Sequence, residues 1–531
     1  MPATCVVVAG STDLHGVVDP QTLAVEGVTV RHGGLSTLSG YFGALRQRFG
    51  RKLLLVDGGD IYQGTLVAKV SKGAAIIAAY NLMGYRAAAL GNHEFDYGGE
   101  DGDPDVNSVL KARIRQARFP FLAANVIDRE SGRRPSWQNL EASEIIDVGG
   151  TPVGVIGVIT PEAPQVTTPQ LVAGLDFLDP VAVVTSEARR LRADGVMLVV
   201  LLAHLGGKCA KVDDPDDLSS CDPDSELHRL LTSLPKGTVD VAFGGHTHSK
   251  VAHWVNGAAA IQPLAQGRQL GYVEACLKPA GGIDRQASTL HAPVSLCLDE
   301  WEDGGCGPRP HAARVVPAKF LGTEIHPQAE VEAALAPYRA QVHDLAAKPI
   351  GVRLPRPLTR EGDGPSLGDL VARAMAESAA VPLAVQNRGG VRDDLKAGEL
   401  TFGDAFQVLP FENRLVVYDL TGEEVRELVE LLVERRDGLP PFVAGLAVRG
   451  SPAEPQVTLA DGAPLEDLRT YRLVTNDYLG MGGEGAGRIF NKADKDGRRL
   501  LDQSVLDAFI DYLTRHFPSP PEAAPRRRAS H

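Results

Sequence analysis

The chain has 531 residues, 44% of them hydrophobic, and 67 acidic residues against 54 basic ones give a formal net charge of -13. This length exceeds what one hydrophobic core fills, so we expect two large domains, and we find no apolar run long enough to cross a membrane. The negative charge argues against nucleic-acid polymers as substrates, because binding a polymer requires a basic surface that tracks its phosphates. The only basic run is Arg526 to Arg528, in a proline-rich end of the chain.

Five short polar motifs each follow an apolar run that is bounded by glycine and is too short for a helix. The predicted strands are Cys5 to Ala9, Leu53 to Val56, Ala87 to Leu90, Val196 to Ala203 and Val239 to Phe243. The motifs behind them are STDLHG from Ser11, GGD from Gly58, GNHEFDYG from Gly91, a lone His204 and GGHTH from Gly244. Ligands bind at the carboxyl ends of strands in open α/β sheets, so we expect these segments to converge on one crevice.

The motifs carry side chains that suit divalent metal ions. Three offer hard oxygens and four offer imidazole nitrogens, namely Asp13, Asp60, Asn92, His15, His204, His246 and His248. Seven ligands suffice for two ions, and a shared carboxylate, for which Asp60 is the natural choice, would hold them roughly 3.5 to 4 Å apart, close enough to clamp one phosphate. This donor set accepts zinc, manganese, iron or cobalt.

Taken singly, these residues have ordinary explanations. A lone histidine after a strand, such as His204, is usually structural, and an Asp-x-His pair such as Asp13 and His15 recurs by chance. The order of the five motifs and their positions at strand ends favour a two-metal phosphoesterase site.

In this order the motifs resemble those of the 5'-nucleotidase family of metallophosphoesterases, and the resemblance covers nearly the whole chain. It implies an α/β fold class, with an N-terminal four-layer αββα metallophosphoesterase domain and a C-terminal α/β substrate-binding domain. It also implies two ligand sets that share Asp60, one with Asp13, His15 and His248 and the other with Asn92, His204 and His246.

The resemblance assigns a catalytic dyad to His93 and Asp96 of the GNHEFDYG motif. A histidine oriented and kept cationic by a carboxylate can stabilise charge on the phosphoryl oxygens or assist the leaving oxygen. The alternative role for Asp96 is that of a loop cap.

The second half of the chain contains three more motifs, QNRGGVR from Gln386, LPFEN from Leu409 and NDYLGMGGEG from Asn476. They look like the family's nucleoside pocket, which implies that an amide, an arginine and two aromatic rings grip a nucleotide and that an acidic side chain accepts the ribose hydroxyls. The matching residues are Asn387, Arg392, Phe411, Tyr478 and Glu484, with Arg360 as a second phosphate ligand. The alternative for Phe411 and Tyr478 is ordinary packing.

Three positions depart from the usual motifs and put the choice of substrate in question. Arg388 replaces a small residue, Tyr478 stands where phenylalanine is common, and Glu484 stands where aspartate is common. Gly362 to Pro365 also disturb the spacing around Arg360. We expect a pocket shifted toward a nucleotide variant.

We expect residues 1–320 to form the metallophosphoesterase catalytic domain, 321–348 a linker helix, 349–515 the substrate-binding domain and 516–531 a disordered tail. Helical spacing from Val331 to Leu345 supports the linker helix, although a helix of the first domain fits equally well. Thr421 and Glu424 form a capping box ahead of an amphipathic helix in the second domain.

The cysteines and the start of the chain bear on cellular location. No signal peptide is visible near Met1, which predicts a cytoplasmic protein, although members of the family are often exported. Cys209 and Cys221 bracket one loop and Cys297 and Cys306 bracket another, an arrangement that fits either loop disulfides or free thiols. Cys5 and Cys276 look like buried strand residues.

These observations predict an enzyme that hydrolyses nucleoside 5'-monophosphates at a site with two divalent metal ions. The alternatives are a nucleotide-sugar or dinucleotide pyrophosphatase, a 2',3'-cyclic nucleotide phosphodiesterase, and a nucleotide-binding protein without turnover. The expected partner is a small-molecule nucleotide, with no nucleic-acid polymer and no membrane, and we expect a monomer or a homodimer.

Overall fold

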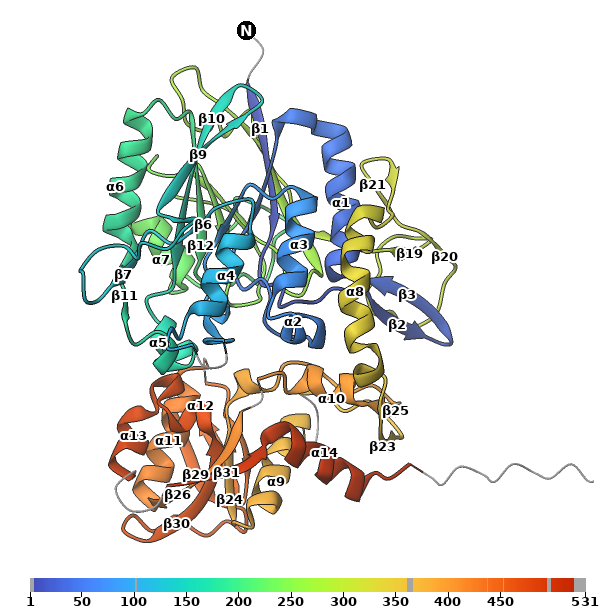
Figure 1. The fold of residues 1–531 in the computed structure, drawn as a ribbon, viewed down its shortest axis with the longest axis vertical. Coiled ribbons are helices and arrows are strands. Elements are labelled where there is room, and N and C mark those ends of the chain that lie inside the picture. Colours follow the sequence, from blue (N-terminus) through green and yellow to red (C-terminus); the bar gives the residue numbers. More distant parts are fainter. Residues whose placement is uncertain are drawn as a thin grey trace, which may run out of the picture. The chain divides into compact units, whose positions relative to one another are not determined.

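The computed structural model describes residues 4–100, 103–360, 366–411, 413–436, 438–451, 453–493 and 498–519. The chain divides into two compact units, Met1–Gln341 and Val342–His531 (Figure 1). The division falls inside helix α8 (Ala329–Ala346), which lies within the range predicted as a linker helix.

The first unit contains two large sheets. In the first sheet the strands lie in the order β17 (Thr289–Leu290), β16 (Gln269–Cys276), β1 (Cys5–Ser11), β4 (Leu53–Asp57), β5 (Ala87–Ala89), β6 (Phe121–Leu122) and β8 (Leu140–Glu141), and β18 (Val294–Ser295) also pairs with β16. Strands β1, β4, β5, β6 and β8 run parallel, and β16 runs antiparallel to β1. The motifs after β1, β4 and β5 therefore emerge at the same edge.

The second sheet has the order β14 (Val251–Val255), β15 (Ala258–Gln262), β13 (Val241–Gly244), β12 (Leu198–His204), β10 (Thr151–Ile159) and β9 (Ser143–Val148). Strands β10, β12, β13 and β15 run parallel. The five predicted strands are thus confirmed as β1, β4, β5, β12 and β13, with ends shifted by at most two residues.

The two sheets pack face to face around one core, to which both contribute fully buried residues such as Val8, Val56, Val155, Val200 and Phe243. The outer face of the second sheet packs against α6 (Pro180–Ala193) and α7 (Glu226–Ser233). Helix α1 (Gly34–Phe49) contacts β4 of the first sheet, and α1 and α3 (Ala74–Met83) lie on that side in Figure 1. The predicted four-layer αββα arrangement is confirmed.

Shorter elements connect these layers. They are β2 (Gln21–Val25), β3 (Val28–His32), α2 (Leu66–Val70), α4 (Ser108–Gln116), β7 (Val126–Asp128), α5 (Ala163–Val166), β11 (Leu175–Phe177), β19 (Asp299–Trp301), β20 (Val315–Pro317), β21 (Lys319–Phe320) and β22 (Thr323–Glu324).

The second unit is built on a mixed sheet with the order β27 (Phe442–Ala444), β24 (Leu383–Gln386), β30 (Thr470–Asn476), β26 (Arg414–Thr421) and β31 (Arg499–Ser504). Its helices are α9 (Leu367–Ala379), α10 (Phe402–Val408), α11 (Gly422–Glu434), α12 (Asp477–Gly480), α13 (Gly487–Ala493) and α14 (Val505–His516). Two further antiparallel sheets of two strands each pair β23 (Pro349–Leu354) with β25 (Gly398–Thr401) and β28 (Leu446–Ser451) with β29 (Glu454–Leu459).

The predicted capping box opens helix α11. Thr421 Oγ1 accepts from the backbone N–H of Glu424 at 3.2 Å, and the Glu424 carboxylate accepts from the backbone N–H of Thr421 at 2.9 Å. The helix buries Val425, Leu428 and Leu432 in the core of the unit. Near the predicted tail, α14 ends at His516 and Pro518 bridges to Val352, while residues 520–531 lie outside the described residues.

Three disulfides join all six cysteines: Cys209–Cys221, Cys297–Cys306 and Cys5–Cys276. The first two settle the loop pairs that the sequence left open. Cys5 and Cys276, expected only to be buried strand residues, also form a bond because β1 and β16 pair in the register that sets them opposite each other. Disulfides persist in oxidising compartments, so the prediction of a cytoplasmic location is wrong.

None of the described helices has the length and apolar character needed to cross a membrane.

Removing the Cys5–Cys276 bond should destabilise the first unit more than removing the Cys297–Cys306 bond. The bridged residues are 271 apart in the first case and 9 in the second, and a longer loop gains more conformational entropy in the unfolded state. We expect C5A/C276A to lower the free energy of unfolding by about 2 to 5 kcal/mol. Calorimetry of both double variants checks this, and an equal or larger loss in C297A/C306A would contradict it.

Candidate functional site

Five of the seven predicted metal ligands lie in loops with left-handed backbone conformation. Asp13 has φ 50°, His15 51°, Asp60 56°, His246 76° and His248 54°. Residues other than glycine rarely adopt positive φ, and such strain persists only where the surrounding structure enforces it. The loops at the strand ends of both sheets thus hold these five residues in backbone conformations of high free energy, which is typical of a functional site.

One group of possible ligands contains Asp13, His15 and His248, whose ligand atoms all lie within 4.8 Å of one another. His15 Nε2 is 2.9 Å from His248 Nε2, and His248 Nε2 is 3.6 Å from Asp13 Oδ1. The carbonyl oxygen of Gln63 lies 2.9 Å from His15 Nδ1. Since a carbonyl can only accept, Nδ1 donates, and the lone pair of the neutral ring is on Nε2, facing the other two ligands.

A second group contains Asp60, His204 and His246, again within 4.8 Å of one another. His204 Nε2 is 3.2 Å from Asp60 Oδ2 and 3.1 Å from Asn92 Oδ1. His204 Nδ1 donates to the carbonyl oxygen of Gly58 at 2.8 Å, and Asn92 Nδ2 donates to the carbonyl oxygen of Val166 at 3.0 Å. These two bonds orient His204 Nε2 and the Asn92 amide oxygen toward each other, 3.1 Å apart.

The Asp60 carboxylate belongs to the second group and also lies close to His15 of the first. Its Oδ2 is 3.2 Å from His204 Nε2 and 3.9 Å from His15 Nε2, and its Oδ1 accepts from the backbone N–H of His93 at 2.8 Å. Donor atoms that share one tetrahedral ion at about 2.1 Å lie about 3.4 Å apart, so the observed spacings fit metal binding. The donor set also fits two divalent ions: it combines hard oxygens with imidazoles, and in His15 and His204 a carbonyl oxygen fixes the second ring nitrogen.

Without metal ions, burial and mutual repulsion perturb the acidic groups of the site. Burial raises the pKa of Asp13 to about 6, with a further contribution from Asp60, and burial raises the pKa of Glu94 to about 8, again helped by Asp60. Burial opposes the charge of His204, but the Asp60 carboxylate outweighs it and raises the pKa of His204 to about 10. Burial likewise opposes ionisation of Asp60, yet His204 and His93 hold its pKa well below the usual range.

His93 and Asp96, which the sequence predicts to be a catalytic dyad, lie in hydrogen-bond contact in the structure. His93 Nδ1 is 2.6 Å from Asp96 Oδ2, and the ring centroids of His93 and His15 are 5.3 Å apart, which brings the dyad beside the first ligand group. The second oxygen of Asp96 accepts from Thr167 Oγ1 at 3.0 Å. Thr167 is buried and lies 71 residues away in the chain, so no motif or spacing pointed to it.

Glu94 is a residue of the same motif whose role the sequence analysis missed. Its buried carboxylate accepts three backbone N–H groups, those of Asp60 at 2.8 Å, Ile61 at 2.7 Å and Gly91 at 2.7 Å. It therefore fixes the loop after β4 to the loop after β5. An acidic residue between two candidate site residues was the available signal.

Asp57, at the end of β4, is a second buried carboxylate that the sequence analysis did not single out. It accepts from Ser11 Oγ at 2.6 Å, from Tyr80 Oη at 3.0 Å and from the backbone N–H of Gly59 at 2.8 Å. Burial raises the pKa of Asp57 to about 7. These contacts fix the turn that leads to Asp60.

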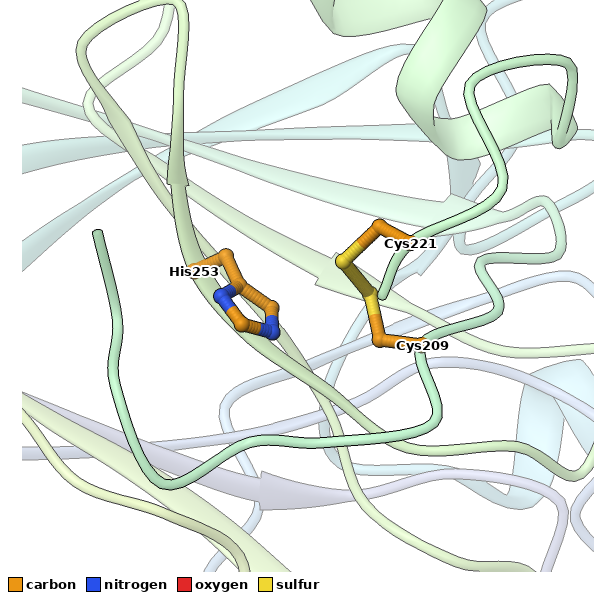
Figure 2. Close-up of side chains that lie close together, drawn as sticks. All are labelled: Cys209, Cys221 and His253. Carbon is orange, nitrogen blue, oxygen red and sulfur yellow. A yellow bond between two sulfur atoms is a disulfide. The ribbon is translucent and has the colours of Figure 1, made fainter. Parts of the chain in front are cut away.

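A third group of possible ligand residues combines Cys209 and Cys221, from the segment between β12 and α7, with His253 of β14. Figure 2 shows the two cysteine sulfurs joined as a disulfide beside the His253 ring. His253 Nε2 is 2.9 Å from the carbonyl oxygen of Lys211 and donates to it. The two sulfurs are bonded to each other, so the cysteines of this group close a loop by a disulfide and are not metal ligands.

In the second unit, three of the predicted pocket residues, Asn387, Tyr478 and Glu484, each make a close contact with a neighbouring residue. Asn476, the N-cap of α12, donates to Asn387 Oδ1 at 2.8 Å. The Tyr478 ring packs so closely on Gly483 that a Cβ there would lie 2.4 Å from its Cζ. The next residue, Glu484, is buried and accepts from Arg436 Nη2 at 2.7 Å. Arg436 follows α11, which the sequence presented only as a core helix.

The other predicted pocket residues form separate contacts. The Arg392 guanidinium lies 5.6 Å from the centre of the Phe411 ring, which is half-buried. Arg388, one of the unusual positions, lies over Phe442 at 4.7 Å and donates to the carbonyl oxygen of Pro440. Arg360 is exposed, and its backbone N–H donates to Asp394 Oδ1 at 2.8 Å. Its neighbours 361–365 lie outside the described residues.

Metal affinity should rise with pH because His204 carries a proton in the metal-free protein at neutral pH. A metal ion binds only the neutral ring, so binding must release that proton, and the competition weakens as the pH approaches the His204 pKa of about 10. Titration calorimetry of the chelator-treated protein with Mn²⁺ between pH 6 and 9, in two buffers of different ionisation enthalpy, measures both effects. Affinity independent of pH would contradict the prediction.

Replacing Glu94 with glutamine (E94Q) should weaken metal binding without unfolding the first unit. The amide can accept through only one of its two ends, so the N–H of Ile61 or those of Asp60 and Gly91 lose their acceptor, and Asp60 loses its fixed position. Loss of such outer-shell support costs about 10- to 100-fold in affinity. The matched control is E100Q, which removes the charge of an exposed glutamate paired with Lys72. Equal metal affinity in both variants would contradict this role.

Two family models match this chain: calcineurin-like phosphoesterase over residues 7–250 and 5'-nucleotidase, C-terminal domain, over residues 346–492. A 5'-nucleotidase of Vibrio vulnificus is 26% identical over 502 residues, which cover 88% of this chain and 83% of the relative. An NAD 5'-nucleotidase of Haemophilus influenzae is 25% identical over 574 residues, covering 95% and 89%. The solved structure of a 5'-nucleotidase precursor from Thermus thermophilus matches with a TM-score of 0.77 and 26% identity over 96% of each chain. The chain therefore belongs to the 5'-nucleotidase family of calcineurin-like metallophosphoesterases.

Proposed function

We propose that this chain hydrolyses nucleoside 5'-monophosphates to nucleoside and phosphate, with a two-metal centre in its first unit and a nucleoside pocket in its second. Membership of the family makes it a metal-dependent hydrolase of 5'-nucleotidase type. The observation that carries the proposal is the position of the Asp60 carboxylate, 3.2 Å from His204 Nε2 and 3.9 Å from His15 Nε2, between two groups of metal-ligand side chains.

Asp60 would bridge two ions, one held also by Asp13, His15 and His248 and the other also by Asn92, His204 and His246. When bound, the ions supply Lewis acidity that polarises the phosphoryl oxygens and lowers the pKa of water. The donor set accepts zinc, manganese, iron or cobalt, so metal identity depends on supply. The buried backbone contacts of Glu94 and Asp57 hold the ligand loops so that little reorganisation is needed on binding.

His93 acts on the phosphoryl group through its Nε2. Its Nδ1 donates to Asp96, which fixes the ring and favours the cationic form, so Nε2 carries a proton directed away from the dyad. That proton can bond a phosphoryl oxygen as charge develops or pass to the leaving ribose oxygen. Thr167 occupies the other Asp96 oxygen and keeps the carboxylate turned toward His93.

The second unit would select the nucleoside. Phe411 and Tyr478, both half-buried, offer two aromatic faces for the base, a contact worth roughly 1 to 3 kcal/mol per base that is tolerant of base identity. We assign Asn387 to the base, Arg392 and Arg360 to phosphate, and Glu484 to the ribose hydroxyls. A free nucleotide is the only partner this scheme needs, and a monomer or homodimer stays a prediction.

A second candidate is cleavage of a dinucleotide pyrophosphate. The relative named NAD 5'-nucleotidase covers 95% of this chain at 25% identity, and the same metal ligands would serve both reactions.

Phosphate release from a panel of substrates tests the proposal. AMP, UDP-glucose, NAD and 2',3'-cyclic AMP are each incubated with Mn²⁺ or Zn²⁺, with a chelator as the control and added phosphomonoesterase to reveal monoester products. We expect chelator-sensitive turnover that is strongest on AMP. Higher kcat/KM on NAD would move the assignment to the second candidate, and no metal-dependent turnover on any substrate would refute an enzymatic role.

His93→Ala should reduce kcat on AMP by about 10²- to 10⁴-fold while metal content stays at the wild-type level, because His93 handles a proton and holds no metal. The matched control is His311→Ala, which removes an exposed histidine paired with Glu26 at 3.2 Å. Turnover of the His93→Ala variant within tenfold of wild type would show that the dyad assignment is wrong.

A further inference from the structure

The Glu484 carboxylate is held in an unusual position in the second unit. The residue is only 3% exposed and has φ 55°, between Gly482 with φ 106° and Gly485 with φ 79°. A left-handed backbone conformation is unfavourable in free energy for any residue other than glycine. Burial of a carboxylate is also unfavourable unless the charge is paired. Both costs are borne at a position beside the Tyr478 ring, which packs against Gly483.

Arg436 reaches Glu484 by passing across Gly389. Its Nη2 donates to Glu484 Oε1 at 2.7 Å, and a Cβ at position 389 would lie 2.6 Å from the same Nη2. The same imagined Cβ would lie 3.6 Å from Asn387 Nδ2. The guanidinium, the Asn387 amide and the Glu484 carboxylate therefore gather around a glycine that leaves them room.

The pairing leaves Glu484 with unused acceptor capacity. A carboxylate has about four lone-pair sites, and within the described part of the chain the bond from Arg436 is the one hydrogen bond recorded for this carboxylate. The hydrogen bond from Arg436 fixes the orientation of the carboxylate, whose oxygens accept hydrogen bonds. Two adjacent hydroxyl groups are donors that match the remaining sites.

We propose that Arg436 is a specificity-determining positioning residue of the nucleoside pocket, which holds the Glu484 carboxylate in one orientation so that the pocket selects ribonucleotides with free 2' and 3' hydroxyls. This inference rests on the proposed function, which assigns the ribose to Glu484. It adds a residue that no motif marks and a substrate class. A 2',3'-cyclic phosphate has no free 2' or 3' hydroxyl to donate, and it places a negative charge near the Glu484 carboxylate. This site therefore disfavours it.

The test compares Arg436→Met with wild type on AMP and on 2',3'-dideoxy-AMP, which have the same base and the same phosphate. We expect KM for AMP to rise about tenfold or more, as expected when a charge-assisted hydrogen bond no longer supports the binding group, with kcat changed by less than about twofold. KM for the dideoxy substrate should not change. Arg436→Lys should restore part of the loss, because a lysine keeps the charge without the planar fork.

Arg488→Met is the matched control, because it removes another arginine of the same unit that pairs with a glutamate, Glu427, at 3.2 Å. Equal increases of KM for AMP and dideoxy-AMP in Arg436→Met would mean a general structural role and would overturn the inference. So would an unchanged KM for AMP. A larger loss on adenosine 3',5'-bisphosphate than on AMP would also overturn it, because Arg436 would then bind a phosphate.

Direct binding separates this inference from the proposed function. Calorimetry with adenosine and 2',3'-dideoxyadenosine requires no turnover, and we expect Arg436→Met to weaken only adenosine. If wild type failed to hydrolyse AMP but showed this hydroxyl-dependent loss, the proposed function would fail and the role of Arg436 would stand. If AMP were hydrolysed and both ligands bound the variant as they bind wild type, only the inference would fail.

Discussion

The burial of one carboxylate, that of Asp60, is the constraint on which the candidate site depends. Asp60 is 1% exposed, has φ 56° and lies between two groups of histidines and an aspartate. A buried negative charge is costly unless it is paired. In the metal-free protein the pairing comes from protonated His204, whose pKa the Asp60 carboxylate raises to about 10 against the effect of burial. A proton on His204 and a metal ion therefore compete for the same position beside Asp60.

The placement of the ligands could be predicted because it follows from local patterns. Short apolar runs before glycine become strands, parallel strands end at one edge, and the polar residues after β1, β4, β5, β12 and β13 meet there. What supports those residues could not be predicted. Glu94 bonds two loops through backbone N–H groups, and Thr167 meets Asp96 across 71 residues. Contacts of this kind depend on tertiary distances that leave no period or spacing in the sequence.

The prediction of a cytoplasmic location was wrong because it rested on the start of the chain, whereas the evidence that overturns it is the three disulfides. The two loop pairs of cysteines were visible from their spacing, but Cys5 and Cys276 meet only because β1 and β16 align antiparallel with these residues opposite each other. The second unit shows the same limit. Asn387, Tyr478 and Glu484 are connected through contacts with Asn476, Gly389 and Gly483. Arg360 instead contacts Asp394 at the surface, and Arg436 follows the end of a core helix.

In the proposed function, selection among substrates comes from the second unit, because a two-metal centre would act on the phosphate of any small ester in the same way. Aromatic stacking on Phe411 and Tyr478 would add affinity but little choice of base. Discrimination then falls on the polar groups that touch the sugar. A glutamate has one more rotatable bond than an aspartate and loses more side-chain entropy when fixed. A fixed Glu484 therefore needs a partner that holds its outer oxygen, and Arg436 is the residue whose hydrogen bond, at 2.7 Å, meets that need.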